Sequence, residues 1–194
     1  MSIVLVGSTS GSITLQEPAV SGNTVLSLPA VSGTLITTGS SGQSIPKAAL
    51  PTGSVLQVVN ATFGTYTSTS STNPVDTGLT ASITPTSSSS KILAFVSING
   101  CEKGNNTASI RFRLVRNSTD IFSFENIIFG ATSSPVAYGN TSTSYLDSPS
   151  TTSATTYKVQ WNVSNGSGTI YINNYGAGGA GTTNCTLTLM EIAA

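Results

Sequence analysis

Apolar and polar residues alternate in short runs along most of this chain, which is the pattern of half-buried β-strands. The clearest run has Ile110, Phe112 and Leu114 alternating with Arg111, Arg113 and Val115. Gly, Pro, Ser and Asn separate the runs, and no window keeps a 3.6-residue apolar repeat. We therefore expect an all-β sandwich or barrel over 53–194, with almost no helix. Its predicted strands are 55–59, 79–84, 91–98, 110–115, 121–124, 144–146, 157–163, 168–172 and 185–192.

Several positions in this domain carry specific expectations. In the last strand, Leu187 and Leu189 should face inward. Ile192 should also face inward, after a shift of one residue in the alternation. Glu102 and Lys103 fall in a predicted loop over 100–106 and read as a solvated pair. A tryptophan within a hydrophobic alternation is typical of a core or a subunit interface, so we favour that interpretation of Trp161 over a sugar-stacking platform.

The first 40 residues have a different pattern, with short apolar runs at 3–6, 13–15, 25–28 and 35–37. The segment 18–22, Pro-Ala-Val-Ser-Gly, returns unchanged as 29–33. Each run is too short to bury a face alone, so neighbouring segments must cover it. We expect 1–40 to be a β-repeat region for anchoring and trimerisation, joined by a linker over 41–52. The candidate anchoring residues are Ile3, Leu5, Ile13, Leu15, Val20, Val25, Leu26, Leu28, Val31 and Leu35.

Charge is scarce in this chain. Charged residues make up 7% of the 194 residues and balance to zero, against about 25% in ordinary globular domains. A net charge of zero gives little repulsion between copies, which favours association. The one basic cluster, Arg111, Arg113 and Arg116, is too small for a nucleic-acid footprint and fits a solvent or subunit-contact face. We expect no nucleic-acid partner.

Candidate catalytic chemistry is equally scarce. The chain has no histidine, which removes the usual nucleophile–base systems and histidine metal sites. Its seven acidic residues fall in no recognisable catalytic context, and the glycine-rich 176–181 segment lacks the Lys-Ser/Thr of a phosphate loop. The apolar run at the start is too short for a signal peptide or a membrane span. We expect no enzyme, cofactor, metal or membrane partner, and synthesis in a cytoplasm.

Four motifs carry a resemblance to a known group. They are LDSPSTTSATTYKVQW at 146–161, ITPTSSSSKIL at 83–93, RLVR at 113–116 and the terminal LTLMEI at 187–192. Together they resemble C-terminal domains of bacteriophage tail-fibre and virion surface proteins. The resemblance implies a jelly roll of the tumour-necrosis-factor/C1q type that assembles as a homotrimer. The segment STSGSITLQEPAV at 8–20 is also similar to phage virion proteins.

The implied jelly-roll topology makes a sharper prediction about the two cysteines. Its last strand runs antiparallel beside the strand at 91–99, which would place Cys185 near Cys101 within one chain. Adjacent reduced thiols are expected rather than a disulfide, because assembly takes place in a cytoplasm.

The resemblance implies a structural virion protein on the outer capsid surface, made in the host cytoplasm. It would be a trimeric capsid decoration (cement) protein, bound to the major capsid protein through 1–40 and projecting 53–194. The alternative is a tail-fibre or receptor-binding tip, attached to tail proteins and gripping host surface glycans with loops at 99–106, 130–140 and 173–184. A bacterial surface adhesin is a third possibility that the missing export signal disfavours.

Overall fold

The computed structural model describes residues 2–6, 12–16, 50–104, 108–125, 137–165, 167–174 and 183–194. Within these residues the chain forms strands and turns and no helix, so the predicted all-β class is confirmed. The chain divides into two units, Met1–Ser44 and Ile45–Ala194. The division falls within the segment 41–52 that the sequence indicates as a linker.

The described part of the first unit is an antiparallel hairpin of β1 (Ser2–Val6) and β2 (Ser12–Gln16). Ile3 lies opposite Leu15, and Leu5 lies opposite Ile13. Alternate residues of a strand share a face, so these four positions occupy one face of the hairpin. A two-stranded sheet is marginally stable at best by itself in water, so this face needs cover from another segment.

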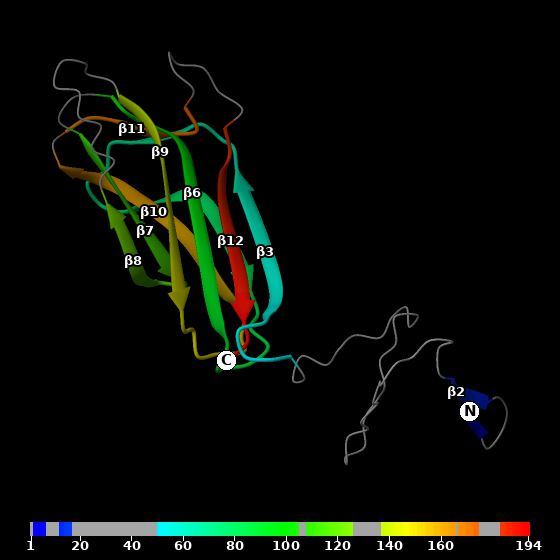
Figure 1. The fold of residues 1–194 in the computed structure, drawn as a ribbon. Coiled ribbons are helices and arrows are strands. Elements are labelled where there is room, and N and C mark those ends of the chain that lie inside the picture. The colour runs from blue at the N-terminus through cyan, green and yellow to red at the C-terminus, as the bar shows by residue number, and fades with distance from the viewer. Residues whose placement is uncertain are drawn as a thin grey trace. The chain divides into compact units, whose positions relative to one another are not determined.

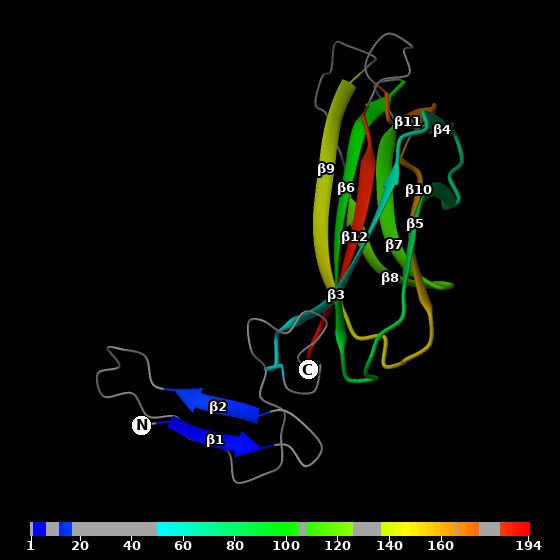
Figure 2. The ribbon, with the colours of Figure 1, turned by 90° about the vertical axis from the view of Figure 1, so that its right-hand side faces the viewer.

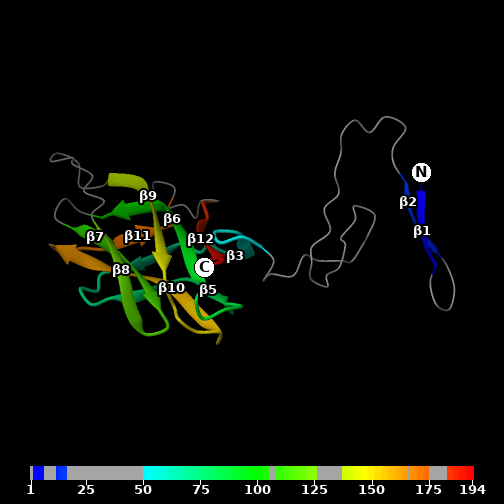
Figure 3. The same cartoon turned by 60° about the horizontal axis from the view of Figure 1, so that its bottom comes forward.

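Two sheets packed face to face form the second unit (Figures 1 and 3). The first sheet has the order β3–β12–β6–β9 and the second has β5–β10–β7–β8. The first contains β3 (Val55–Phe63), β12 (Cys185–Ile192), β6 (Lys91–Lys103) and β9 (Ala137–Asp147). The second contains β5 (Val75–Ile83), β10 (Thr155–Asn165), β7 (Ser109–Arg116) and β8 (Thr119–Glu125).

Numbered along the chain, these strands run 1-8-3-6 in one sheet and 2-7-4-5 in the other, which is the jelly-roll order. The predicted antiparallel pairing of the last strand with 91–99 is confirmed, with Leu189 opposite Ala94. Two short strands, β4 (Thr67–Thr69) and β11 (Ile170–Ile172), extend the first sheet beside the end of β6.

The core lies between the two sheets and consists of the inward residues of each alternation. Trp161 and Tyr157 are completely buried there, as are Leu187 and Leu189. The Phe112 ring stacks on Trp161 with ring centroids 6.2 Å apart. The interpretation of Trp161 as a core residue is confirmed, and a buried indole offers no platform for a sugar.

A buried carboxylate ties the two sheets together. Arg116 Nη1 on β7 donates hydrogen bonds to both oxygens of Asp147 on β9, each at 2.8 Å. The Tyr157 hydroxyl on β10 donates to Asp147 Oδ2 at 2.6 Å. Burial raises the pKa of Tyr157, and the Asp147 carboxylate raises it further. The phenol therefore stays protonated and remains a donor.

Two details of the sequence prediction are wrong. Glu102 and Lys103 belong to β6 and are buried, because the strand continues past a register shift between Ile98 and Cys101. At the C-terminus, Glu191 is the buried residue and Ile192 is only part-buried. The Glu191 carboxylate tolerates this position because it accepts hydrogen bonds from the backbone and hydroxyl of Thr86 and from the Gln57 amide.

Candidate functional site

The outer side of the β3–β12–β6–β9 sheet carries a row of apolar residues, one from each strand. Val58 is opposite Met190, Met190 is opposite Leu93, and Leu93 is opposite Leu146. Residues directly opposite each other on antiparallel strands lie on the same face, where their side chains touch. Val58 and Leu146 are each 55% exposed. The row is therefore a continuous apolar band across the whole width of the sheet.

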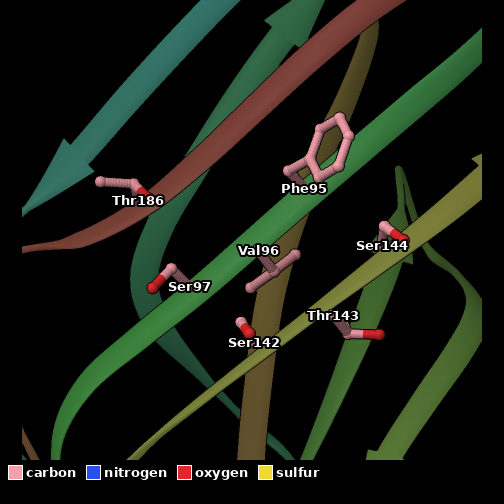
Figure 4. Close-up of a pocket in the computed structure, with 7 residues that line it drawn as sticks. All are labelled: Phe95, Val96, Ser97, Ser142, Thr143, Ser144 and Thr186. Atoms are coloured by element: carbon pink, nitrogen blue, oxygen red, sulfur yellow. The ribbon is translucent and has the colours of Figure 1, made fainter.

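On the side toward Ser97, the next rows along the same face are small and polar, apart from one aromatic residue. Phe95, 43% exposed, lies two residues after Leu93 and opposite Thr188 and Ser144. Its ring stands at the rim of a shallow hollow of about 460 Å³. The hollow is lined by Phe95, Val96, Ser97, Ser142, Thr143, Ser144 and Thr186 from β6, β9 and β12 (Figure 4).

This face, which we call the neutral face, is almost without charge. Its strand β3 contains no charged residue, and β12 and β9 turn Glu191 and Asp147 inward. Among the described residues of the rows that cross β6 at Lys91, Leu93, Phe95 and Ser97, only Lys91, the first residue of β6, carries a charge. The Lys91 ammonium donates to Ser148 Oγ at 2.8 Å, so its charge is held at the edge.

The outer side of the second sheet, the charged face, is built differently. Lys158 Nζ lies 3.0 Å from Asp76 Oδ1, and Gln160 Nε2 donates to the same oxygen at 2.7 Å. Arg113 Nη1 lies 3.0 Å from Asp120 Oδ2. These pairs suit a surface in contact with water.

The composition of the neutral face is that of a protein interface. Interface centres are enriched in aromatic residues and Met and depleted in Lys, Glu and Asp. Soluble monomers rarely expose large contiguous apolar patches. The neutral face combines Phe95, Met190 and two exposed aliphatic residues with a hollow into which a side chain of another molecule could insert. Chemically, the arrangement can bind a protein surface.

The predicted anchoring residues fall mostly outside the described part of the chain. Ile3, Leu5, Ile13 and Leu15 lie in the hairpin, where the register pairs them on one face. The others lie outside the described residues, as do both copies of the repeat. They are Val20, Val25, Leu26, Leu28, Val31 and Leu35.

Both cysteines are free and buried at the same end of the core. Cys185 Sγ accepts a hydrogen bond from the Asn99 backbone at 3.4 Å, and Cys101 Sγ donates to the Ile98 carbonyl at 3.7 Å. Burial raises the pKa of the Cys101 thiol, and the neighbouring Cys185 raises it further. Thiols with raised pKa values are poor nucleophiles, so these two act as small core residues.

Asn173 is a structural residue that the sequence reasoning missed. Its side chain amide donates to the carbonyl oxygens of Phe63 and Thr65 at 2.9 and 3.0 Å, and its Oδ1 lies 3.2 Å from Cys185 Sγ. It thereby joins the end of β3 to the start of β12. Its φ is positive, at 56°, a conformation that Asn tolerates better than most residues. An Asn at a turn is therefore the only sequence feature that could have indicated its structural role.

Comparison with protein families and with curated proteins adds no relative. The sequence matches no protein-family model, and no curated protein is similar to it. In the described segments, no helix is long and apolar enough to cross a bilayer, and no group of three or more His, Cys, Asp or Glu residues could hold a metal ion.

Proposed function

We propose that this chain is a structural virion protein, a homotrimeric capsid decoration protein. Its N-terminal region would attach to the major capsid protein on the outer surface of the particle, and its jelly roll would project outward. The virion role rests on the resemblance of 83–93, 113–116, 146–161 and 187–192 to phage surface proteins. The homotrimer rests on the neutral face as well.

The neutral face is the observation that carries the trimer. Around a threefold axis, equivalent residues of three copies approach one another, so a charge near the axis meets its own copies. Like charges in close contact cost several kcal/mol. A face that keeps Lys91 at its edge and exposes Val58, Phe95 and Leu146 avoids this repulsion and gains from apolar burial.

The hairpin supports the attachment. Ile3, Leu5, Ile13 and Leu15 occupy one face of a two-stranded sheet, which is unstable without cover. Capsid subunits, or the other two chains of the trimer, would supply this cover. In the jelly roll, Gly53 and Ser54 exchange backbone hydrogen bonds with Ala193, so the chain enters the sandwich at the end that also holds its C-terminal residues (Figure 2). The opposite end would point away from the shell.

Deletion of residues 1–40 tests the attachment. The truncated chain should remain a soluble, folded trimer and should no longer bind capsids assembled without this protein. A finer variant replaces Ile3, Leu5, Ile13 and Leu15 with serine, and its control replaces Val4 and Val6 on the other face of β1. We expect only the first to lose capsid binding in a sedimentation assay. Capsid binding by the truncated chain would refute the anchoring role.

A tail-fibre or receptor-binding tip is the second candidate, and one observation favours it. Tyr66 and Tyr138, 40% and 47% exposed, lie near the end of the jelly roll opposite the C-terminal residues, where a receptor would be met first. Copy number separates the two functions. A decoration protein is present in numbers comparable to the capsid subunits, whereas a fibre protein is confined to a few copies on the tail. Quantitative mass spectrometry of purified particles measures this ratio.

A further inference from the structure

The end of the first sheet that carries β4 and β11 lies opposite the C-terminal residues (Figure 2). Strand pairing brings tyrosines and a carboxylate together at this end. Glu102 lies between Tyr138 of β9 and Tyr171 of β11 in one cross-strand row. Tyr66, just before β4, stacks on Tyr171 with ring centroids 5.7 Å apart and planes 18° apart. Burial raises the pKa of Tyr66, and the nearby Tyr171 and Glu102 raise it further, as expected if these groups are close.

A glycine brings a second polar group to this carboxylate. Gly100 has a positive φ of 61°, and a Cβ there would lie 2.5 Å from the Asn174 carbonyl oxygen. The missing side chain lets the Asn174 backbone N–H donate to the Gly100 carbonyl at 3.0 Å. As a result, the Asn174 side-chain amide reaches Glu102 and donates a hydrogen bond to its Oε2.

The Glu102 and Asn174 side chains have hydrogen-bond acceptor positions that no described residue occupies. Glu102 is 8% exposed and Asn174 is 5% exposed. Among the described residues, no group donates to Asn174 Oδ1. A carboxylate has about four acceptor positions, and the hydrogen bonds within the described residues fill one of those on Glu102. The remaining acceptor positions of the Glu102 carboxylate are therefore suited to a ligand that brings O–H or N–H donors.

The tyrosine rings decide which ligand fits. A cage for a quaternary ammonium group needs aromatic faces that converge on the cation. Here Tyr66 covers one face of Tyr171 in a near-parallel stack, so these rings form a flat platform instead. A pyranose sugar has a flat apolar face of C–H groups and a rim of hydroxyl donors. We propose that Tyr66, Tyr138, Tyr171 and Glu102 form a saccharide-binding site, with a ring stacked on tyrosine and adjacent hydroxyls donating to the Glu102 carboxylate, which the Asn174 amide holds in place.

This site does not depend on the trimer or on the capsid attachment, although it includes Tyr66 and Tyr138, the two tyrosines that favour the tail-fibre candidate. It lies beyond the register shift between Ile98 and Cys101, whereas the apolar row of the neutral face crosses β6 at Leu93. A chain that fails to trimerise or to bind capsids could still bind sugar here, and a trimer could assemble without doing so.

Saturation-transfer NMR on the full chain tests the proposal. The probes are the methyl glycosides of glucose, galactose, mannose and N-acetylglucosamine, with tetramethylammonium as a non-sugar cation. At least one glycoside should show transfer, strongest at its ring C–H protons. Tyr66→Ala and Glu102→Gln should each weaken binding and raise the dissociation constant about tenfold, equivalent to 1.4 kcal/mol. Phe95→Ala removes an aromatic of similar exposure from the neutral face and should leave sugar binding unchanged.

Other results would overturn the proposal. Absence of transfer to all four glycosides refutes it, and so does an equal loss of binding in Phe95→Ala and Tyr66→Ala. Transfer to tetramethylammonium alone would make the cluster a cation site instead. The melting temperature of each variant shows whether it is folded, and Tyr66→Phe keeps the ring, so it should retain binding where Tyr66→Ala loses it.

Discussion

The two outer faces of this sandwich have the same backbone geometry and opposite chemistry. On the charged face, Lys158 pairs with Asp76 and Arg113 pairs with Asp120. On the neutral face, Val58, Met190, Leu93 and Leu146 form an apolar row. The contrast teaches that the jelly-roll fold itself does not determine how a face meets its surroundings. The outward-facing residues of each strand determine it, and they can differ between faces while the inward-facing residues form the same kind of core.

The charged residues within the neutral-face strands sharpen this contrast. Glu191 and Asp147 are buried beneath the face and satisfied by hydrogen bonds from other strands. Burial of a carboxylate is unfavourable unless donors compensate it, so inward placement is costlier than outward placement. That β12 and β9 nonetheless turn these two carboxylates inward is consistent with an outer surface that carries little charge around the apolar row.

The largest expected difference is in oligomeric state, between a variant with a lysine introduced on the neutral face and one with a lysine introduced on the charged face. Phe95→Lys puts a charge on the neutral face and should convert the proposed trimer to a folded monomer, because burying each unpaired ammonium costs several kcal/mol. Ser82→Lys adds the same side chain at an exposed position of β5, on the charged face, and should leave the trimer intact. Sedimentation equilibrium measures both masses. A trimer of unchanged stability in Phe95→Lys would contradict the role assigned to the neutral face.

The next largest difference is expected in stability, between a variant that removes a buried carboxylate and one that removes an exposed carboxylate. Asp147→Ala leaves Arg116 and Tyr157 without their acceptor and should lower the free energy of unfolding by about 3 kcal/mol, the low end for a broken buried pair. Asp120→Ala breaks the exposed pair with Arg113 and should cost less than about 1 kcal/mol. Urea unfolding of the two variants measures the difference, and equal losses would show that Asp147 is not a tie between the sheets.

Acid should act on the neutral-face sheet through Glu191. Burial alone would raise the pKa of Glu191, but hydrogen bonds from Thr86 and Gln57 outweigh it and hold the value at about 2. The stabilisation is complete above the ordinary pKa near 4.5 and is lost as the pH falls through 2. Unfolding experiments at pH 6 and pH 3 should differ by about 2 kcal/mol from this residue. Glu191→Gln should remove that part of the pH dependence; an unchanged slope would contradict the assignment.

Salt should have the smallest effect on assembly. Exposed charges are screened within about 3 Å at 1 M salt, but among the described residues of the rows that cross β6 from Lys91 to Ser97, Lys91 is the only charged one. We expect the proposed trimer to dissociate no more in 1 M NaCl than in dilute buffer. Dissociation at high salt, followed by light scattering, would show that charge pairs hold the trimer together and would weaken the comparison of the two faces.

Much of the fold could be predicted from the alternation of residues. The inward set Ile110, Phe112 and Leu114 and the pair Leu187 and Leu189 are read directly from a period of two, and all are buried in the structure. The order of the strands needed the resemblance, because local alternation carries no information about which strands pair.

The remaining features depend on register and on local irregularities. The apolar row joins residues from four strands that are distant in sequence, so no window of the chain displays it. The strand β9 extends well beyond its predicted core at 144–146, because its Ser and Thr residues give no hydrophobic contrast. From the sequence, Glu102 and Lys103 are assigned to a solvated loop because two adjacent charged residues are typical of loops. The strand in fact continues past Gly100 and includes both.

The pairing of Gly53 and Ser54 with Ala193 also has a practical consequence for engineering. The Gly53 N–H donates to the Ala193 carbonyl at 2.8 Å, and the Ala193 N–H donates to the Ser54 carbonyl at 2.9 Å. A peptide or fluorescent domain fused after Ala194 would therefore emerge beside the point where the chain enters the sandwich. Cargo intended for display belongs instead at the end carrying β4 and β11, where attached groups would be farthest from that junction.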